Sequence, residues 1–178
     1  MPRLLLILIM ALVLCGCQNE IPQEKILLDF ETDAELDRIH WRCHALMSLS
    51  KEHVTHGKSC LKLEVFPSKY PGMNPELKGC DWREYRAFCF DIFNPREEAI
   101  PLVVWIDDGS KNREFGDRLN EVFNVKKGAT TITIPLGNLL TSGTKRQMNL
   151  GRICQFGIYM MNPEEKTELH VDYIRLVR

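Results

Sequence analysis

Beyond residue 17, the apolar residues of this chain fall into short runs separated by turn-forming residues, and no stretch shows the sustained 3.6-residue period of a helix. Residues 60–65 alternate between apolar and charged side chains, as a strand with one buried face does. Residues 85–93 are apolar at nearly every position, which favours a central strand covered on both faces. Many short strands with turns between them predict an all-β fold, and among such folds a β-sandwich.

Turn-forming residues mark the limits of the other elements. We expect the remaining strands at these ranges: 26–31, 41–49, 52–54, 102–106, 119–125, 130–134, 152–161 and 169–177. The strands at 119–125 and 130–134 are predicted to form a hairpin. A capping-box pattern predicts one helical turn at 32–35. Residues 68–79 contain two prolines and two glycines and predict a loop.

The first 16 residues have the composition of an export signal. Arg3 precedes an apolar run at residues 4–14, which is shorter than the roughly 20 residues that a membrane-spanning helix needs. The run ends in the sequence LCGC, which resembles the lipobox of bacterial lipoproteins. The resemblance implies a signal peptide at 1–16 and a lipidated Cys17. The alternatives are an ordinary signal peptide and an N-terminal anchor helix that is not cleaved.

A polar segment follows the predicted lipid anchor. Residues 17–24 include Pro22 and are expected to form a tether, and residues 25–178 to form one jelly-roll β-sandwich domain. The net charge of −1 is too small for a protein that follows nucleic acid phosphates. Gln18 stands where lipoproteins retained in the inner membrane of enteric bacteria have aspartate. We therefore expect attachment to the bacterial cell envelope, at the outer membrane.

Five cysteines follow Cys17, so disulfide pairing would leave at least one thiol over. They are Cys43, Cys60, Cys80, Cys89 and Cys154. The chain has no C-x-x-C motif, which argues against a zinc or redox site. We favour free core thiols over disulfides, which export would permit.

Four short segments together resemble the galactose-binding-like jelly roll of carbohydrate-binding modules. They are residues 28–31 (LDFE), 56–63 (HGKSCLKL), 81–85 (DWREY) and 169–176 (LHVDYIRL). Their order spans nearly all of the chain after the signal. The resemblance implies a non-catalytic envelope lipoprotein whose domain binds a glycan. The alternative is a structural envelope lipoprotein whose sandwich contacts another protein.

The same resemblance implies a structural calcium ion where the two chain ends meet. Its expected ligands are Asp29, Glu31 and Asp172, with carbonyl groups from the Gly-Lys-Ser turn. Calcium binds six to eight oxygens, which carboxylates and carbonyls can supply. The alternative is that these acids are simply solvated.

A second set of segments resembles uncharacterised carbohydrate-module-like domains of bacterial envelope proteins. It comprises two acids after a strand, the run 117–123 (DRLNEVF) and the exit 132–136 (ITIPL), with Leu119 in place of an aromatic residue. The polar candidates that these segments contribute, together with a later arginine, are Asp107, Asp108, Asp117, Arg118, Asn120 and Arg146. Such groups form paired hydrogen bonds with sugar hydroxyls. The alternative, slightly favoured for Arg118, is a buried bridge between Asp107 and Arg118 that only joins two strands.

Other side chains complete the candidates. Flat aromatic faces for sugar rings could come from Trp41, Trp82, Tyr85, Trp105 and Tyr159, of which Trp105 is the favoured ligand-binding residue. The alternative for the aromatic residues is core packing. Asp107 and Asp108 are adjacent and would point to opposite faces of a strand, so we do not expect a glycosidase pair. His53 and His56 are expected at the surface.

Overall fold

The computed structural model describes residues 23–77, 81–109 and 114–178, without the side chains of residues 40–42. The predicted signal peptide, Cys17 and most of the tether therefore lie outside the described residues. Among the helices that are described, none is long and apolar enough to span a bilayer.

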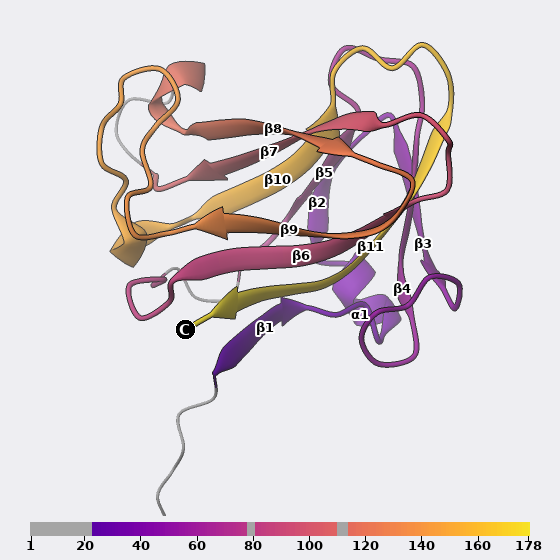
Figure 1. Cartoon of the computed structure of the whole chain (residues 1–178), viewed down its shortest axis with the longest axis horizontal. Coiled ribbons are helices and arrows are strands. Elements are labelled where there is room, and N and C mark those ends of the chain that lie inside the picture. Colours follow the sequence, from indigo (N-terminus) through magenta and orange to yellow (C-terminus); the bar gives the residue numbers. More distant parts are fainter. Residues whose placement is uncertain (1–22, 78–80, 110–113) are drawn as a thin grey trace, which may run out of the picture.

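Two antiparallel sheets pack face to face, as the sequence predicts for a jelly-roll β-sandwich (Figure 1). Within the described residues, sheet A has the order β3-β4-β11-β6-β9, with β1 also paired to β11, and sheet B has the order β2-β5-β10-β7-β8. The strands of sheet A are β1 (Glu24–Leu28), β3 (Ala45–Ser50), β4 (Cys60–Val65), β6 (Ala87–Asn94), β9 (Gly128–Pro135) and β11 (Thr167–Val177). Those of sheet B are β2 (Ile39–Cys43), β5 (Gly72–Pro75), β7 (Ile100–Asp107), β8 (Leu119–Val125) and β10 (Gln155–Met160).

Helices are short in the described part of the chain: α1 (Asp33–Leu36), η1 (Phe115–Asp117) and η2 (Leu150–Arg152). The capping-box pattern does predict α1, but its Thr32 makes no side-chain cap. The Glu35 carboxylate instead accepts hydrogen bonds from the backbone N–H groups of Asp29 and Glu31, at 3.2 and 2.9 Å. Glu35 therefore fixes the chain as it leaves β1.

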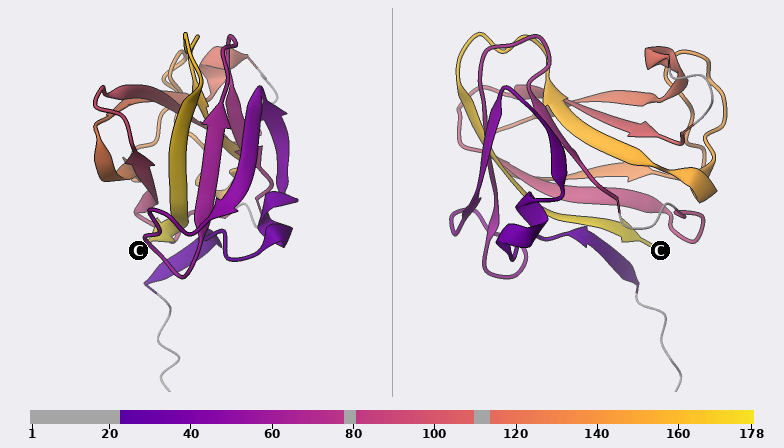
Figure 2. Two further views of the ribbon diagram at one scale, coloured as in Figure 1. Left: turned by 90° about the vertical axis from the view of Figure 1, so that its right-hand side faces the viewer. Right: turned by 180° about the vertical axis from the view of Figure 1, so that it is seen from behind.

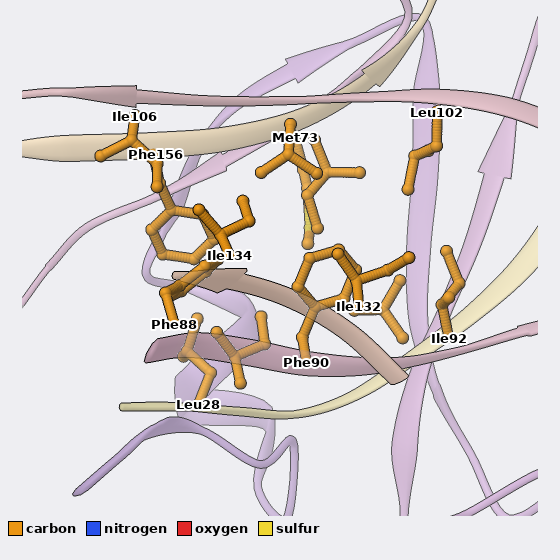
Figure 3. Packing of buried hydrophobic residues seen from close by; sticks show 14 of the residues in the cluster. Leu28, Met73, Phe88, Phe90, Ile92, Leu102, Ile106, Ile132, Ile134 and Phe156 are labelled. Carbon is orange, nitrogen blue, oxygen red and sulfur yellow. The ribbon is translucent and has the colours of Figure 1, made fainter. Parts of the chain in front are cut away.

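Apolar side chains from alternate positions of both sheets fill the space between them (Figure 3). Phe88 and Ile134 point inward from sheet A, and Ile106 and Phe156 meet them from sheet B. Burial of each such side chain stabilises the fold by about 1.5–3 kcal/mol. The side chains at the intervening positions point outward, and the candidate sites lie there.

The two ends of the domain lie side by side. Glu24 of β1 is paired with Val177 of β11, and both views of Figure 2 show the chain entering β1 beside the C-terminus. In Figure 1, β1 lies at the bottom of the molecule and β8 at the top. Glu24, where β1 begins, therefore lies on the side of the domain opposite to β8.

The predicted hairpin at 119–125 and 130–134 is wrong. β8 pairs with β7 in sheet B, whereas β9 pairs with β6 in sheet A. The turn after β8 carries the chain across the sandwich, with Gly128 at a φ of 90°. Each of the two strands buries its apolar side against the opposite sheet. The sequence of the short turn between them does not reveal that the chain passes from sheet B to sheet A.

Three further predictions of strands and loops also need correction. The run at 41–49 is divided at His44, whose φ is 43°, into β2 of sheet B and β3 of sheet A. Residues 52–54 form part of a loop rather than a strand. The predicted loop at 68–79 contains β5, which pairs with β10. At Gly72 a Cβ atom would lie 2.2 Å from the carbonyl oxygen of Ile158, so a larger residue would clash there. Glycine permits this close pairing of β5 with β10.

Candidate functional site

A small aromatic cluster lies on the outer face of sheet B, separate from the main core. It consists of Val103 and Trp105 on β7 and Tyr159 on β10. Their neighbours in the strands, Val104 and Ile158, point inward, so the alternation of the pleat sends these three outward. Trp105 and Tyr159 are only 8% and 4% exposed, because further residues cover them.

Gly157 determines how Trp105 lies. The two residues are paired across β10 and β7, and a Cβ atom at Gly157 would come within 2.3 Å of Trp105 Nε1. The indole therefore extends across the backbone of β10 at a position where any other residue would carry a side chain. This contact forms an aromatic floor on the sheet.

A pocket of about 370 Å³ opens above this floor. Its lining combines aromatic rings with polar side chains: Tyr70, Asn74, Trp105, Phe115, Arg118, Gln155 and Tyr159. Tyr70 is 41% exposed and Phe115 is 60% exposed, so both present open ring surface. Tyr70 also meets Tyr159 edge to face, with 5.6 Å between ring centroids.

Arg118 is the charged group of this lining. Its Cζ lies 4.6 Å from the ring centre of Trp105 and 4.7 Å from that of Phe115. Burial lowers the pKa of Arg118, while the nearby Tyr159 and Asp107 act in the opposite direction. Arg118 forms no ion pair with any Asp or Glu of the described residues. Two aromatic rings therefore contact the guanidinium, which also lines the pocket.

Asn120 positions this arginine. Its Oδ1 accepts a hydrogen bond from Arg118 Nε at 3.1 Å, and its Nδ2 donates to the carbonyl of Phe115 at 3.0 Å. The predicted bridge from Asp107 to Arg118 is not the arrangement found. The Asp107 carboxylate instead accepts from the backbone N–H of Gly109 at 2.6 Å.

The remaining three polar candidates form a bridge with a different arginine. Arg146 binds Asp108 through both Nη atoms, at 2.8 and 2.9 Å, and Asp117 through Nε at 2.9 Å. Asp108 and Asp117 are 2% and 5% exposed. Burial alone would raise the pKa of Asp108, but Arg146 and the N–H of Asn149 outweigh it and lower that pKa. The network joins the end of β7 to the loop before η2, and a ligand role for its members stays a prediction.

The other aromatic candidates lie elsewhere. Trp82 is completely buried and stacks on Phe88, with 5.2 Å between centroids. Tyr85 is half-buried and packs against the core. The side chain of Trp41 lies outside the described residues. Sequence reasoning missed Tyr70 and Phe115, because both occur in stretches rich in turn-forming residues.

Asp172, one of the predicted calcium ligands, uses both oxygens as hydrogen-bond acceptors. Oδ2 accepts from the N–H of Thr55 at 2.7 Å, from its hydroxyl at 3.1 Å and from the N–H of His56 at 2.9 Å. Oδ1 accepts from the N–H of Tyr173 at 2.7 Å. Burial raises the pKa of Asp172, and these bonds oppose the rise. N–H groups point at the places where a cation would sit.

Glu31 and Asp29 also bind the loop between β3 and β4. Glu31 Oε1 accepts from the N–H groups of Lys58 and Ser59, at 2.8 and 3.0 Å, and these two bonds are the main reason that the Glu31 pKa is lowered. Asp29 Oδ2 lies 3.5 Å from Nδ1 of His56. This hydrogen-bonded arrangement does not fit a site with six to eight oxygen ligands. Calcium at Asp29, Glu31 and Asp172 stays a prediction.

The cysteines occupy different environments. Cys43, Cys60 and Cys89 are free thiols, and the last two are buried. Cys154 is exposed, and its Sγ donates to the carbonyl oxygen of Asp107 at 3.4 Å. Cys80 lies outside the described residues.

Comparison with known proteins identifies other proteins that have this fold. No family model and no curated protein sequence matches the chain. Among solved structures, the family 11 carbohydrate-binding module from Clostridium thermocellum, in complex with a β-1,3-1,4-mixed-linked tetrasaccharide, superposes with a TM-score of 0.65 and 18% identity, over 86% of this chain and 95% of the module. A mutant of a family 29 carbohydrate-binding module gives a TM-score of 0.56 at 10% identity, over 86% and 89%.

Parts of larger enzymes have the same fold. An exo-β-agarase superposes with a TM-score of 0.69 and 18% identity, over 85% of this chain but only 24% of the agarase. The fold therefore occurs both in binding modules and as a fraction of enzyme chains. The chain has the jelly-roll sandwich fold that these carbohydrate-binding modules also have.

Proposed function

We propose that the domain binds a glycan in the pocket on the outer face of sheet B. The observation that carries the proposal is Arg118, whose guanidinium contacts the rings of Trp105 and Phe115 in the lining of an open pocket. The pocket volume, about 370 Å³, falls in the range of small-molecule sites, roughly 300–1,000 Å³. The family 11 module, which has a similar fold, was solved in complex with a tetrasaccharide, and this supports the same class of ligand.

The lining offers contacts both to the C–H face of a sugar ring and to its polar groups. The open rings of Tyr70 and Phe115 can pack against the C–H face of a pyranose. Arg118 can donate to hydroxyl or carboxylate oxygens, and the Asn74 and Gln155 amides can each donate and accept. Stacking would therefore contribute affinity, and the polar edge would select the orientation of the sugar.

We also propose that the domain is not catalytic. Retaining and inverting glycosidases use two carboxylates on either side of the bond that breaks. Within the described residues, the lining of this pocket contains neither Asp nor Glu. Two of the candidate acids are bound elsewhere: Asp117 pairs with Arg146, and Asp107 accepts from the N–H of Gly109.

The proposal includes a lipid anchor at Cys17 in the bacterial outer membrane. Its support is the sequence LCGC after an apolar run, and the exit of β1 on the side of the domain opposite to β8. Cys17→Ala should leave the precursor uncleaved and unlipidated. Metabolic labelling with a radioactive fatty acid tests this: label that persists in Cys17→Ala would contradict the anchor.

A glycan array tests the ligand, with neutral and acidic oligosaccharides side by side. We expect a sugar hit that falls at least tenfold in affinity in Arg118→Ala and in Tyr70→Ala. Arg86→Ala, which removes an exposed arginine beside β6 in sheet A, is the matched control and should bind like the parent. A blank array, together with capture of an envelope protein, would favour the alternative of a structural lipoprotein.

A further inference from the structure

The outer face of sheet A carries a second group of polar side chains, beneath the loop at 51–59. Leu61 of β4 and Val171 of β11 point into the core, so their neighbours Cys60 and His170 point outward. Both outward side chains are buried, although they lie on the outside of the sheet. The connection from β3 to β4 covers them.

His53 is the loop residue that faces this pair. Its backbone is in the left-handed region, with a φ of 59°. Its ring stacks on Phe93 with 3.5 Å between centroids, and it meets the ring of His170 edge-on at 4.7 Å. A left-handed residue at this point thus directs the imidazole down toward the sheet.

The donor atoms gather at the spacing of a metal centre. One atom each from Glu52, His53 and His170 lie within 4.8 Å of one another. Cys60 Sγ lies 3.7 Å from Nδ1 of His170. Two ligands of a tetrahedral zinc ion, a sulfur at about 2.3 Å and a nitrogen at about 2.0–2.1 Å from the metal, stand about 3.6 Å apart.

A second set of contacts orients His170. Its Nε2 lies 3.1 Å from Glu168 Oε1, and Glu168 is held in turn by Lys62 at 2.7 Å. A carboxylate on the far nitrogen is the usual way in which a protein fixes a metal-binding histidine. Here it leaves Nδ1 facing Cys60.

The surrounding charges suit a cation. The Glu52 carboxylate belongs to the cluster, and that of Glu168 lies on the other side of His170. Glu52 and His53 are exposed, so an ion can reach the cluster from solvent. Imidazole and thiolate ligands together favour zinc and its neighbours in the transition series.

We propose that Glu52, His53, Cys60 and His170 bind one zinc ion on the outer face of sheet A. The Cys60 thiol would release its proton to solvent on binding, and the ion would fasten the 51–59 loop to β4 and β11. The site lies on the opposite sheet from the glycan pocket and does not depend on the proposed function. The absence of a C-x-x-C motif does not exclude it, because its ligands come from two strands and a loop.

Metal titration of the purified, tag-free and reduced protein tests the proposal. We expect one zinc ion per chain by calorimetry, and cobalt in its place should give the visible absorption of a tetrahedral site with a sulfur-to-cobalt charge-transfer band. His53→Asn keeps a residue that tolerates the left-handed backbone and should lower zinc affinity more than tenfold. His170→Gln and Cys60→Ser should act likewise, and Cys60→Ser should remove the charge-transfer band.

His56→Gln is the matched control, because His56 lies in the same loop but stacks on Tyr173 instead. It should bind zinc like the parent. Thermal melting without metal shows whether each variant is folded, and the cobalt spectrum of the parent identifies sulfur even where Cys60→Ser does not fold. Absence of one-to-one binding by the parent, equal affinity in His53→Asn and His56→Gln, or a cobalt spectrum without the sulfur band would overturn the proposal.

Discussion

On the outer face of sheet B the pocket around Arg118 is open, whereas on the outer face of sheet A a loop lies over His170. Both groups stand on outward positions of central strands, β7 and β10 in one sheet and β4 and β11 in the other. On sheet B, Gly157 leaves space that a flat indole fills, and exposed rings border it. On sheet A, Asp172 and Glu31 bind backbone N–H groups of the 51–59 loop and hold it down.

The outward positions of the two sheets therefore differ in what they can bind. An open face with flat rings and a single guanidinium can receive a large ligand from outside. On the face that a hydrogen-bonded loop covers, the proposed ligand is a single ion. The same contrast holds for the two arginines of the polar candidates: Arg118 faces the pocket, and Arg146 faces two buried carboxylates.

The largest effect on stability is expected for Arg146→Ala. Removal of this arginine takes away the cation that pairs with the buried Asp108 and Asp117 carboxylates, which costs about 3–5 kcal/mol. Denaturant unfolding of the variant beside the parent measures the loss.

The effect should also depend on pH. Because the folded-state pKa of Asp108 is lowered, its stabilising contribution is present above the usual value of 3.8 and is lost as the pH falls through the folded pKa. The difference between parent and variant should therefore shrink in acid. A loss in Arg146→Ala no greater than that in Arg118→Ala would break the distinction between the two arginines.

Gly157→Ala should have the next largest effect. The added Cβ would meet Trp105 Nε1 at 2.3 Å, so the indole must move or the strands must separate, at about 1–3 kcal/mol. Glycan affinity should fall with it, since Arg118 rests on that indole. Gly137→Ala is the control, because a Cβ there meets nothing within 4 Å. Equal stability of the two variants would mean that Gly157 does not shape the pocket.

Arg118→Ala should change stability much less than it changes glycan binding. It removes two contacts between a cation and a ring, each worth about 0.5–1 kcal/mol at a partly exposed site, and leaves no carboxylate of the described residues unpaired. We expect a loss of about 1 kcal/mol in denaturant unfolding. A loss of several kcal/mol would make Arg118 part of the scaffold instead of the pocket.

The smallest effect is expected for calcium. Asp172 and Glu31 already accept N–H groups, so the melting temperature should be the same in calcium and in chelator. An ion that bound only the native state would stabilise it by about 2.7 kcal/mol at a hundredfold excess over its dissociation constant. A calcium-dependent rise in melting temperature would support the predicted calcium site at Asp29, Glu31 and Asp172.

The sequence determined the class of fold, because alternation along a strand is a local property. The pattern at 60–65 predicts β4, and the apolar run at 85–93 predicts β6, and both strands are found. The candidate residues Trp105, Arg118 and Tyr159 could also be chosen from residue type and position. Burial of one face of a strand leaves a period of two in the sequence, whatever the strand pairs with.

Only the tertiary structure decided what the strands pair with and what each polar residue contacts. β8 and β9 belong to different sheets, although a short turn joins them, and β5 runs through a stretch of prolines and glycines. The two arginines of the polar candidates have opposite surroundings, and His53 meets His170 from 117 residues away in the chain. Contacts of this kind join segments that are distant in sequence. They depend on how the two sheets pack, and the local sequence around each residue therefore does not predict them.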